Sequence, residues 1–274
     1  MEFIQKLYNQ DCVFKRDMPI NTNQANGIKA LLRVKIKDKL KTYERETSSM
    51  PFLAKLMQDT EKVAAYSFIH SLATTLGMSM YEQIAEIIAK PYFDIAKVGY
   101  DVEGTISTEE NTTIASIMQE MKNKSRTVNK DKEIAEILKC KNSNGTNLKI
   151  RADLFLKRGN DEFYIEIKTA KPNIDVFNKS KQKLLEWVAL RKKKVTTILA
   201  IPYNPYHPEP YTRFTLQGVL DEEKELYVAD KFWNFLGGKN TYEELLNIFD
   251  EVGKEFKSQI QAKIKEVAKE KMGL

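Results

Sequence analysis

Cysteine and histidine are scarce in this chain of 274 residues, which contains two of each. Two cysteines, Cys12 and Cys140, cannot build a disulfide framework or a structural zinc site. The two histidines, His70 and His207, likewise exclude a histidine-rich metal centre. Any metal ion must therefore be held mainly by carboxylates, which favours Mg²⁺, Mn²⁺ or Ca²⁺.

Long apolar runs are also missing. No stretch approaches the roughly 18 apolar residues that cross a membrane, and the first residues lack the basic-then-apolar pattern of a signal peptide. Charge of one sign is only in mild excess, because 44 Lys and Arg stand against 38 Asp and Glu, a net charge of +6. This balance fits a polyanionic partner without demanding one. We therefore expect a soluble, cytoplasmic protein with no membrane partner.

Helical patterns dominate roughly the first half of the chain. In the most apolar of these stretches, Gly77 is expected to interrupt the helix and Pro91 to end it. A polar run, VEGTISTEENTT, is interpreted as a loop. The predicted segments are helices at 22–44, 61–90, 114–121 and 131–138, and the polar loop at 102–113.

The pattern changes near residue 148, where apolar and polar side chains begin to alternate at period two. LKIRADLFLKRG and EFYIEIKTA predict two neighbouring strands joined by a tight turn at 158–161. A helix at 179–191 and a strand in VTTILAIPY follow. A capping box formed by Thr241 and Glu244 is expected to open the C-terminal helix.

This order of elements predicts one α/β domain over residues 1–274. Its first part, 1–145, is expected to be helical, and 146–274 to contain the sheet and the C-terminal helices. No internal repeat is present, and no linker is long enough to force a domain boundary.

Two carboxylates and a lysine fall on matching faces of the two predicted strands. Side chains alternate between faces, so Tyr164, Glu166 and Lys168 share one face of the second strand, whose other face is apolar. On the first strand, Asp153 lies opposite the apolar face that includes Leu154. If the strands pair, Asp153 lies next to Glu166.

This set of residues suits the hydrolysis of a phosphodiester. Asp153 and Glu166 would hold a hard divalent cation, together with the carbonyl of Ile167. Lys168 would orient or help to deprotonate the attacking water, or stabilise charge at the phosphorus. The alternative is a solvated face on which these side chains form ion pairs.

The same residues resemble a known signature. Asp153, twelve residues, and then Glu166-Ile167-Lys168 is similar to the pattern of the PD-(D/E)XK nucleases, although Ala152 stands where that family often has proline. The segments IEIKTAKPN, AIPYNPYHPEPYTRF and KFWNFLGGKNTYEELLNIF resemble type II restriction endonucleases of the TdeIII-like group. The resemblance implies a restriction-endonuclease-like core, in which helices flank a central mixed β-sheet, with helical N- and C-terminal parts.

The resemblance also implies an activity. It indicates a Mg²⁺-dependent type II restriction endonuclease that hydrolyses duplex DNA at a short, palindromic, GGNCC-like site in a prokaryotic cell. Mn²⁺ is expected to replace Mg²⁺, and Ca²⁺ to support binding without cleavage. A palindrome implies a homodimer, because each subunit reads one half-site. A cognate DNA methyltransferase is the expected functional partner.

Further site residues follow from the resemblance and from charge. Glu82, on a helix before the sheet, is expected to support the metal site, as in many such nucleases. Basic residues provide phosphate contacts and the loop at 203–213 provides base-reading groups. The predicted DNA-binding residues are Lys122, Lys124, Arg126, Lys181, Asn204, His207 and Arg213.

Two alternative functions remain open. One is another PD-(D/E)XK nuclease that acts in repair or cleaves DNA junctions. The other is a non-catalytic DNA-binding protein with the same fold, although Asp153, Glu166 and Lys168 are all present. Cleavage of a plasmid with and without Mg²⁺ separates the enzymes from the binding protein.

Overall fold

A computed structural model describes residues 20–44, 50–141, 144–168, 171–212 and 218–269 of the chain. The described residues form two compact units. The sheet unit comprises residues 85–242, and the helical unit comprises residues 20–84 and 243–269. A single endonuclease domain over 1–274 stays a prediction.

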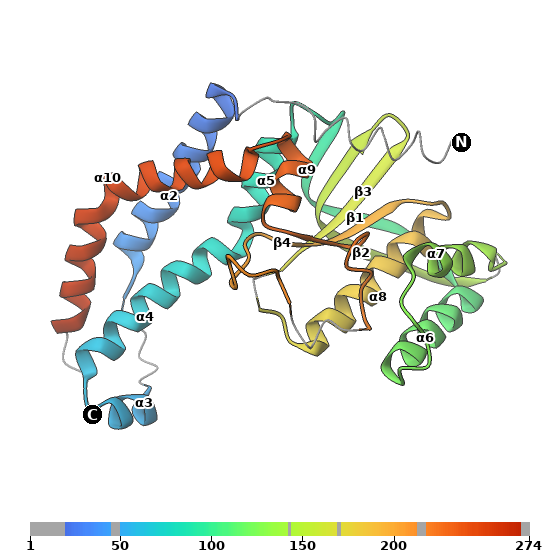
Figure 1. Cartoon of the computed structure of the whole chain (residues 1–274), viewed down its shortest axis with the longest axis horizontal. Coiled ribbons are helices and arrows are strands. Elements are labelled where there is room, and N and C mark those ends of the chain that lie inside the picture. The colour runs from blue at the N-terminus through green and yellow to red at the C-terminus, as the bar shows by residue number, and fades with distance from the viewer. Residues whose placement is uncertain (1–19, 45–49, 142–143, 169–170, 213–217, 270–274) are drawn as a thin grey trace. The chain divides into compact units, whose positions relative to one another are not determined.

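The described residues of the sheet unit contain a five-stranded mixed sheet in the order β1-β2-β3-β4-β5 (Figure 1). The pairs β1–β2 and β2–β3 are antiparallel, whereas β3–β4 and β4–β5 are parallel. Helices flank this sheet, so the expected α/β fold with a central mixed sheet is confirmed. The strands are β1 Ile95–Ser107, β2 Gly145–Arg158, β3 Asp161–Ile167, β4 Thr196–Ile201 and β5 Leu226–Val228.

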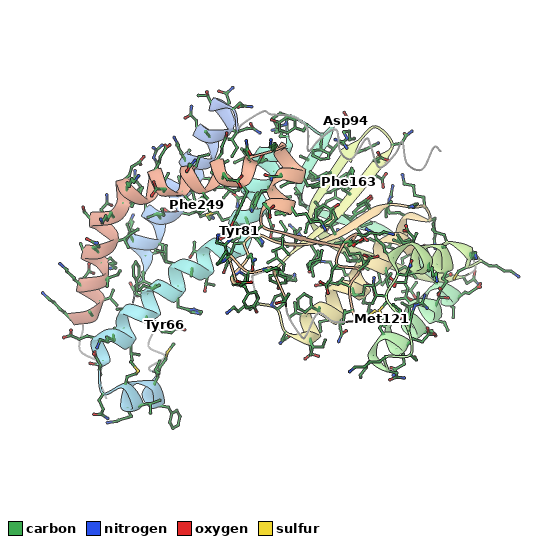
Figure 2. The ribbon with its side chains drawn as sticks, viewed as in Figure 1. Tyr66, Tyr81, Asp94, Met121, Phe163 and Phe249 are labelled. Carbon is green, nitrogen blue, oxygen red and sulfur yellow. The ribbon has the colours of Figure 1, made fainter. Side chains whose placement is uncertain are left out.

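Helices bury both faces of β3. On one face, α8 (Ile174–Arg191) places Trp187 in a core with Tyr164 of β3, and α6 (Thr108–Lys122) and α7 (Lys130–Lys139) pack against α8. On the other face, the ring of Phe163, labelled in Figure 2, lies 5.4 Å from that of Phe235 in α9 (Asp230–Gly237). Because alternate side chains of a strand point to opposite faces, β3 is an interior strand buried on both sides.

The expected polar loop at 102–113 is wrong, because this stretch forms the end of β1 and the start of α6. β1 is an edge strand, and polar side chains on its exposed positions mask an alternation in which Val102 and Ile106 are buried. Ser107 ends the strand and caps the helix. Its hydroxyl accepts a hydrogen bond from the Glu110 backbone N–H (3.2 Å), and the Glu110 carboxylate accepts one from the Ser107 N–H (2.7 Å).

The predicted helices in the helical unit are confirmed. The π-helical turn over Leu76–Met80 contains Gly77, so the expected interruption is present. α5 ends at Ala89, two residues before Pro91, as a proline requires. The helices are α2 Thr22–Thr42, α3 Pro51–Met57, α4 Thr60–Thr75, α5 Tyr81–Ala89 and α10 Thr241–Lys269, of which α5 and α10 also carry residues of the sheet unit.

Two helices from opposite ends of the sequence run parallel in the helical unit. Lys29 of α2 forms an ion pair with Glu251 of α10. One turn further along both helices, Arg33 donates two hydrogen bonds to the carboxylate of Glu255, at 2.8 and 2.6 Å. In the residues that the structure describes, we find no helix with the length and apolar character needed to cross a membrane.

The expected capping box at the start of α10 is wrong. The helix begins at Thr241 itself, so Thr241 is the first helical residue rather than the cap. Its hydroxyl donates a hydrogen bond to the carbonyl of Gly238 (2.7 Å). The Glu244 carboxylate accepts a hydrogen bond from the backbone N–H of Ile20 (2.7 Å) instead.

A buried carboxylate on β3 anchors the end of α8. Glu162, whose side chain is 7% exposed, accepts hydrogen bonds from Arg191 (3.0 and 3.1 Å), Lys193 (2.9 Å) and the Tyr164 hydroxyl (2.8 Å). Burial by itself raises the pKa of Glu162, but the hydrogen bonds from Arg191, Lys193 and Tyr164 outweigh it and lower the pKa to about 2. The carboxylate of Glu162 is therefore ionised in the folded protein at neutral pH.

Glu162→Gln should make the protein less stable at neutral pH and less sensitive to acid. Because the pKa of Glu162 is depressed in the folded state, its contribution is present above its ordinary pKa of 4.5 and is lost as the pH falls towards 2. Urea midpoints of both proteins between pH 7 and pH 2.5 test this. A gap between wild type and variant that stays constant over that range would contradict it.

Candidate active site

The carboxylates of Asp153 and Glu166 lie next to each other where β2 and β3 separate. The last paired residues on this side are Leu154 and Ile165, so Asp153 and Glu166 occupy the next facing position. Oδ2 of Asp153 accepts a hydrogen bond from the backbone N–H of Ile167 (2.7 Å). The proximity expected from strand pairing is therefore confirmed.

Lys168 joins the two carboxylates into one cluster. Its Nζ contacts Oε1 of Glu166 and lies 3.9 Å from Oδ2 of Asp153. The side chain of Glu166 is 6% exposed, whereas those of Asp153 and Lys168 are 20% and 32% exposed. The cluster is thus open to solvent on the side of Asp153 and Lys168 and closed behind Glu166, which differs from a solvated face of ion pairs.

Lys183 of α8 is a neighbour of the cluster that sequence reasoning missed. Its Nζ contacts Oε2 of Glu166 and lies 5.3 Å from the centroid of the Trp187 ring. Lys183 and Trp187 are four residues apart and hence on one helix face. One signal in the sequence could have identified Lys183. It is a lysine one turn from a core tryptophan, on the helix that follows the catalytic strand.

The prediction that Lys181, on the same helix, contacts DNA is wrong. Two residues along a helix correspond to a rotation of about 200°, so Lys181 points away from the face that carries Lys183. Its side chain is 0% exposed, and its Nζ lies 2.6 Å from carboxylate oxygens of both Glu133 and Glu225. A fully buried ammonium that two carboxylates neutralise cannot reach a phosphate of DNA.

Electrostatics around Asp153 favour a bound cation. Burial raises the pKa of Asp153, and the neighbouring charge of Glu166 raises it further, against the opposing effects of the Ile167 N–H, Lys168 and Lys183. Two carboxylates held together in a half-buried place repel each other; Lys168 and Lys183 relieve part of that repulsion, and a metal ion could take over this role.

The donor set is compatible with a hard divalent ion. Asp153 and Glu166 offer carboxylate oxygens, and the carbonyl of Ile167 follows directly on β3. Among the described residues, no group of three or more His, Cys, Asp or Glu side chains gathers at one point. Two carboxylates with a carbonyl suit Mg²⁺. This ion keeps several of its waters, and phosphate oxygens commonly complete its coordination shell.

Glu82, predicted to support the metal, lies on α5 in the helical unit and is half-buried. Asp153 and Glu166 belong to the sheet unit. The role of Glu82 therefore stays a prediction.

The predicted basic contacts at the end of α6 and just after it divide into two kinds. Lys122 and Lys124 are exposed, as a phosphate contact requires. Arg126 forms ion pairs with Glu120 (3.1 Å) and Glu136 (2.5 Å), and its side chain is 15% exposed. Arg126 thus links α6 to α7, and contact with DNA would require it to leave these carboxylates.

The loop predicted to read bases is partly described. Asn204 uses both ends of its amide to close the loop, because it donates to the Glu209 carbonyl (2.7 Å) and accepts from the Tyr206 N–H (2.9 Å). These bonds compete with a base contact by Asn204. His207 is exposed, and Arg213 lies outside the described residues.

Comparison with known proteins gives the family. Residues 20–253 match the model of a family described as type II restriction endonuclease, HinfI. The type II restriction enzyme MjaII of Methanocaldococcus jannaschii is 31% identical over 209 residues, which cover 68% of this chain and 54% of that enzyme. HgiEI of Herpetosiphon aurantiacus is 26% identical over 275 residues, which cover 90% of this chain and 99% of that enzyme.

These matches differ in extent. The matched region spans about half the length of MjaII, three quarters of HgiCII from Herpetosiphon aurantiacus (29% identical, 72% of this chain) and nearly all of HgiEI. The resemblance to type II restriction endonucleases is confirmed, whereas the narrower TdeIII-like group stays a prediction. The chain belongs to the HinfI family of type II restriction endonucleases.

Proposed function

We propose that this chain is a Mg²⁺-dependent endonuclease of the PD-(D/E)XK type that hydrolyses duplex DNA at a short palindromic, GGNCC-like site. The observation that carries the proposal is the convergence of Asp153, Glu166 and Lys168 at one opening between β2 and β3. Membership of a type II restriction endonuclease family supports duplex DNA as the substrate.

Each residue of the cluster has a distinct role in this proposal. Asp153, Glu166 and the carbonyl of Ile167 hold the metal, with Glu82 as support. When bound, the divalent ion neutralises phosphate oxygens and lowers the pKa of water. Lys168 orients the attacking water and stabilises negative charge that develops on the phosphate. The cover of α8 over Glu166 limits the water around the cluster and strengthens these interactions.

Recognition requires contacts beyond the cluster. Exposed Lys122 and Lys124 are suited to phosphate contacts, while His207 and Arg213 remain the proposed base readers. A palindromic site calls for a homodimer, and a restriction enzyme of this kind works beside a DNA methyltransferase in the cytoplasm of a prokaryotic cell.

The proposal is tested by cleavage of plasmid and phage DNA with Mg²⁺, Mn²⁺, Ca²⁺ or EDTA. We expect discrete fragments with Mg²⁺ and Mn²⁺, and binding without cleavage with Ca²⁺. Sequencing the fragment ends gives the recognised site. Binding without cleavage under every condition would favour a non-catalytic DNA-binding protein, and cleavage of branched DNA alone would favour a junction-cleaving enzyme.

Lys168→Ala should slow cleavage by about 10²–10³-fold and leave DNA binding in Ca²⁺ nearly unchanged. The ammonium is needed mainly as charge develops on the attacking water and the phosphate, and much less in the ground state. Single-turnover cleavage at saturating enzyme measures the rate. A variant that cuts within a few-fold of wild type would remove Lys168 from the catalytic cluster.

A further inference from the structure

Both carboxylate oxygens of Glu166 are held by lysines. Oε1 contacts Nζ of Lys168, and Oε2 contacts Nζ of Lys183. The proposed metal ion needs at least one of these oxygens. An ammonium and a divalent ion on the same carboxylate repel each other, so binding of the metal favours displacement of one ammonium from Glu166.

The two lysines reach Glu166 from different secondary-structure elements. Lys168 follows Glu166 on the same strand and also lies 3.9 Å from Asp153, so it stays near the cluster even if one contact breaks. Lys183 reaches Glu166 from a separate element, α8. Its side chain is 22% exposed, so Lys183 is partly accessible to solvent.

The tryptophan ring beside the ammonium of Lys183 is held by contacts to β2 and β3. The Trp187 ring, 5.3 Å from Nζ of Lys183, lies 5.9 Å from the ring of Tyr164 in β3. The indole N–H of Trp187 donates to the carbonyl of Ile150 in β2 (3.3 Å). The ammonium of Lys183 therefore lies beside a fixed aromatic ring as well as Glu166, and it can exchange one anionic partner for another while it stays near that ring.

We propose that Lys183 is a place-holding cation that makes metal binding depend on DNA. Without DNA, the ammonium of Lys183 occupies Oε2 of Glu166 and opposes entry of a divalent ion. When DNA is bound, Lys183 moves to a backbone phosphate, and Glu166 is released to the metal. This inference rests on the proposed function, because it requires both a metal at Glu166 and a phosphate in the opening.

The physical basis is competition between like charges. A divalent ion beside Glu166 is repelled by an ammonium only a few ångströms away, and the low exposure of Glu166 limits screening. A phosphate of bound DNA supplies negative charge that attracts the ammonium of Lys183 away from Glu166. By linkage, DNA must raise the affinity for metal by the same factor as metal raises the affinity for DNA.

Calorimetric titration of the full chain with Ca²⁺, with and without a duplex that the wild type cuts in Mg²⁺, tests the inference. Lys183→Met keeps most of the stem and removes the charge. We expect it to bind Ca²⁺ about tenfold more tightly than wild type without DNA, and the enhancement of Ca²⁺ affinity by DNA to shrink by a similar factor. Lys183→Arg, which keeps the charge, should behave like wild type.

Controls separate this role from a structural one. Lys179→Met removes an exposed charge one turn earlier on α8 and should leave Ca²⁺ affinity unchanged. Lys183→Gln gives a second neutral variant if Lys183→Met does not fold, and should also bind Ca²⁺ more tightly. Neutral variants that change the melting temperature but not Ca²⁺ affinity would overturn the inference. Failure of the wild type to cut DNA or bind Ca²⁺ would instead overturn the proposed function.

Discussion

Asp153→Asn should lower the rate of DNA cleavage by about 10³-fold or more while the protein stays folded. Partners in the outer shell of a metal site typically contribute roughly 10–100-fold to affinity or activity, and loss of a direct ligand should exceed that. The asparagine carbonyl can still accept the hydrogen bond that Oδ2 of Asp153 receives from the Ile167 N–H. The substitution thus removes the charge and keeps the local backbone geometry.

Single-turnover cleavage with Mg²⁺ and a thermal melt of the same preparations measure the two effects. Asp153→Ala should be equally inactive and also less stable, by about 1 kcal/mol, because the Ile167 N–H loses its partner. Asp161→Asn, an exposed change at the start of β3, is the matched control and should cut at the wild-type rate. Wild-type cleavage by Asp153→Asn would remove Asp153 from the proposed metal site.

Lys181→Ala should destabilise the sheet unit by about 3–5 kcal/mol, the range typical for breaking a buried ion pair by removing one partner. The side chains of Glu133 and Glu225 are 0% and 1% exposed, and both lose their ammonium partner. The Glu225 carboxylate also accepts the Asp221 N–H at 3.0 Å, so the strain should reach the segment that leads into β5.

Urea unfolding followed by circular dichroism gives the free energy of unfolding for this comparison. Lys179→Ala removes an exposed lysine from the same helix and should change the stability by no more than about 0.5 kcal/mol. A loss below about 1 kcal/mol for Lys181→Ala would show that water enters the cluster and solvates the two carboxylates.

The core of the candidate site was predictable because it depends on local patterns. Period-two alternation placed Asp153 and Glu166 on matching faces of adjacent strands, and the antiparallel register brings them together as expected. The edge strand β1 was missed for the opposite reason. Its half-exposed surface accepts polar residues, which weakens the apolar alternation by which strands are recognised.

The choice between Lys181 and Lys183 required more than charge. Lys181 falls in the middle of an apolar stripe with Phe177, Leu184 and Val188, and that helical spacing predicts a buried position. Its two carboxylate partners come from α7 and from the segment before β5, far away in the sequence. Such long-range pairing cannot be inferred from one sequence, and so a buried lysine was interpreted as a DNA contact.

The parallel pairing of α2 with α10 has a consequence for biosynthesis. Arg33 leaves the ribosome more than two hundred residues before Glu255, the carboxylate to which it binds (|i−j| = 222). The described part of the sheet unit, in contrast, comes from one stretch of chain, residues 85–242. Because domains form as their residues emerge, the sheet can assemble first, whereas the ion pairs of α2 with α10 can form only after the last helix is translated.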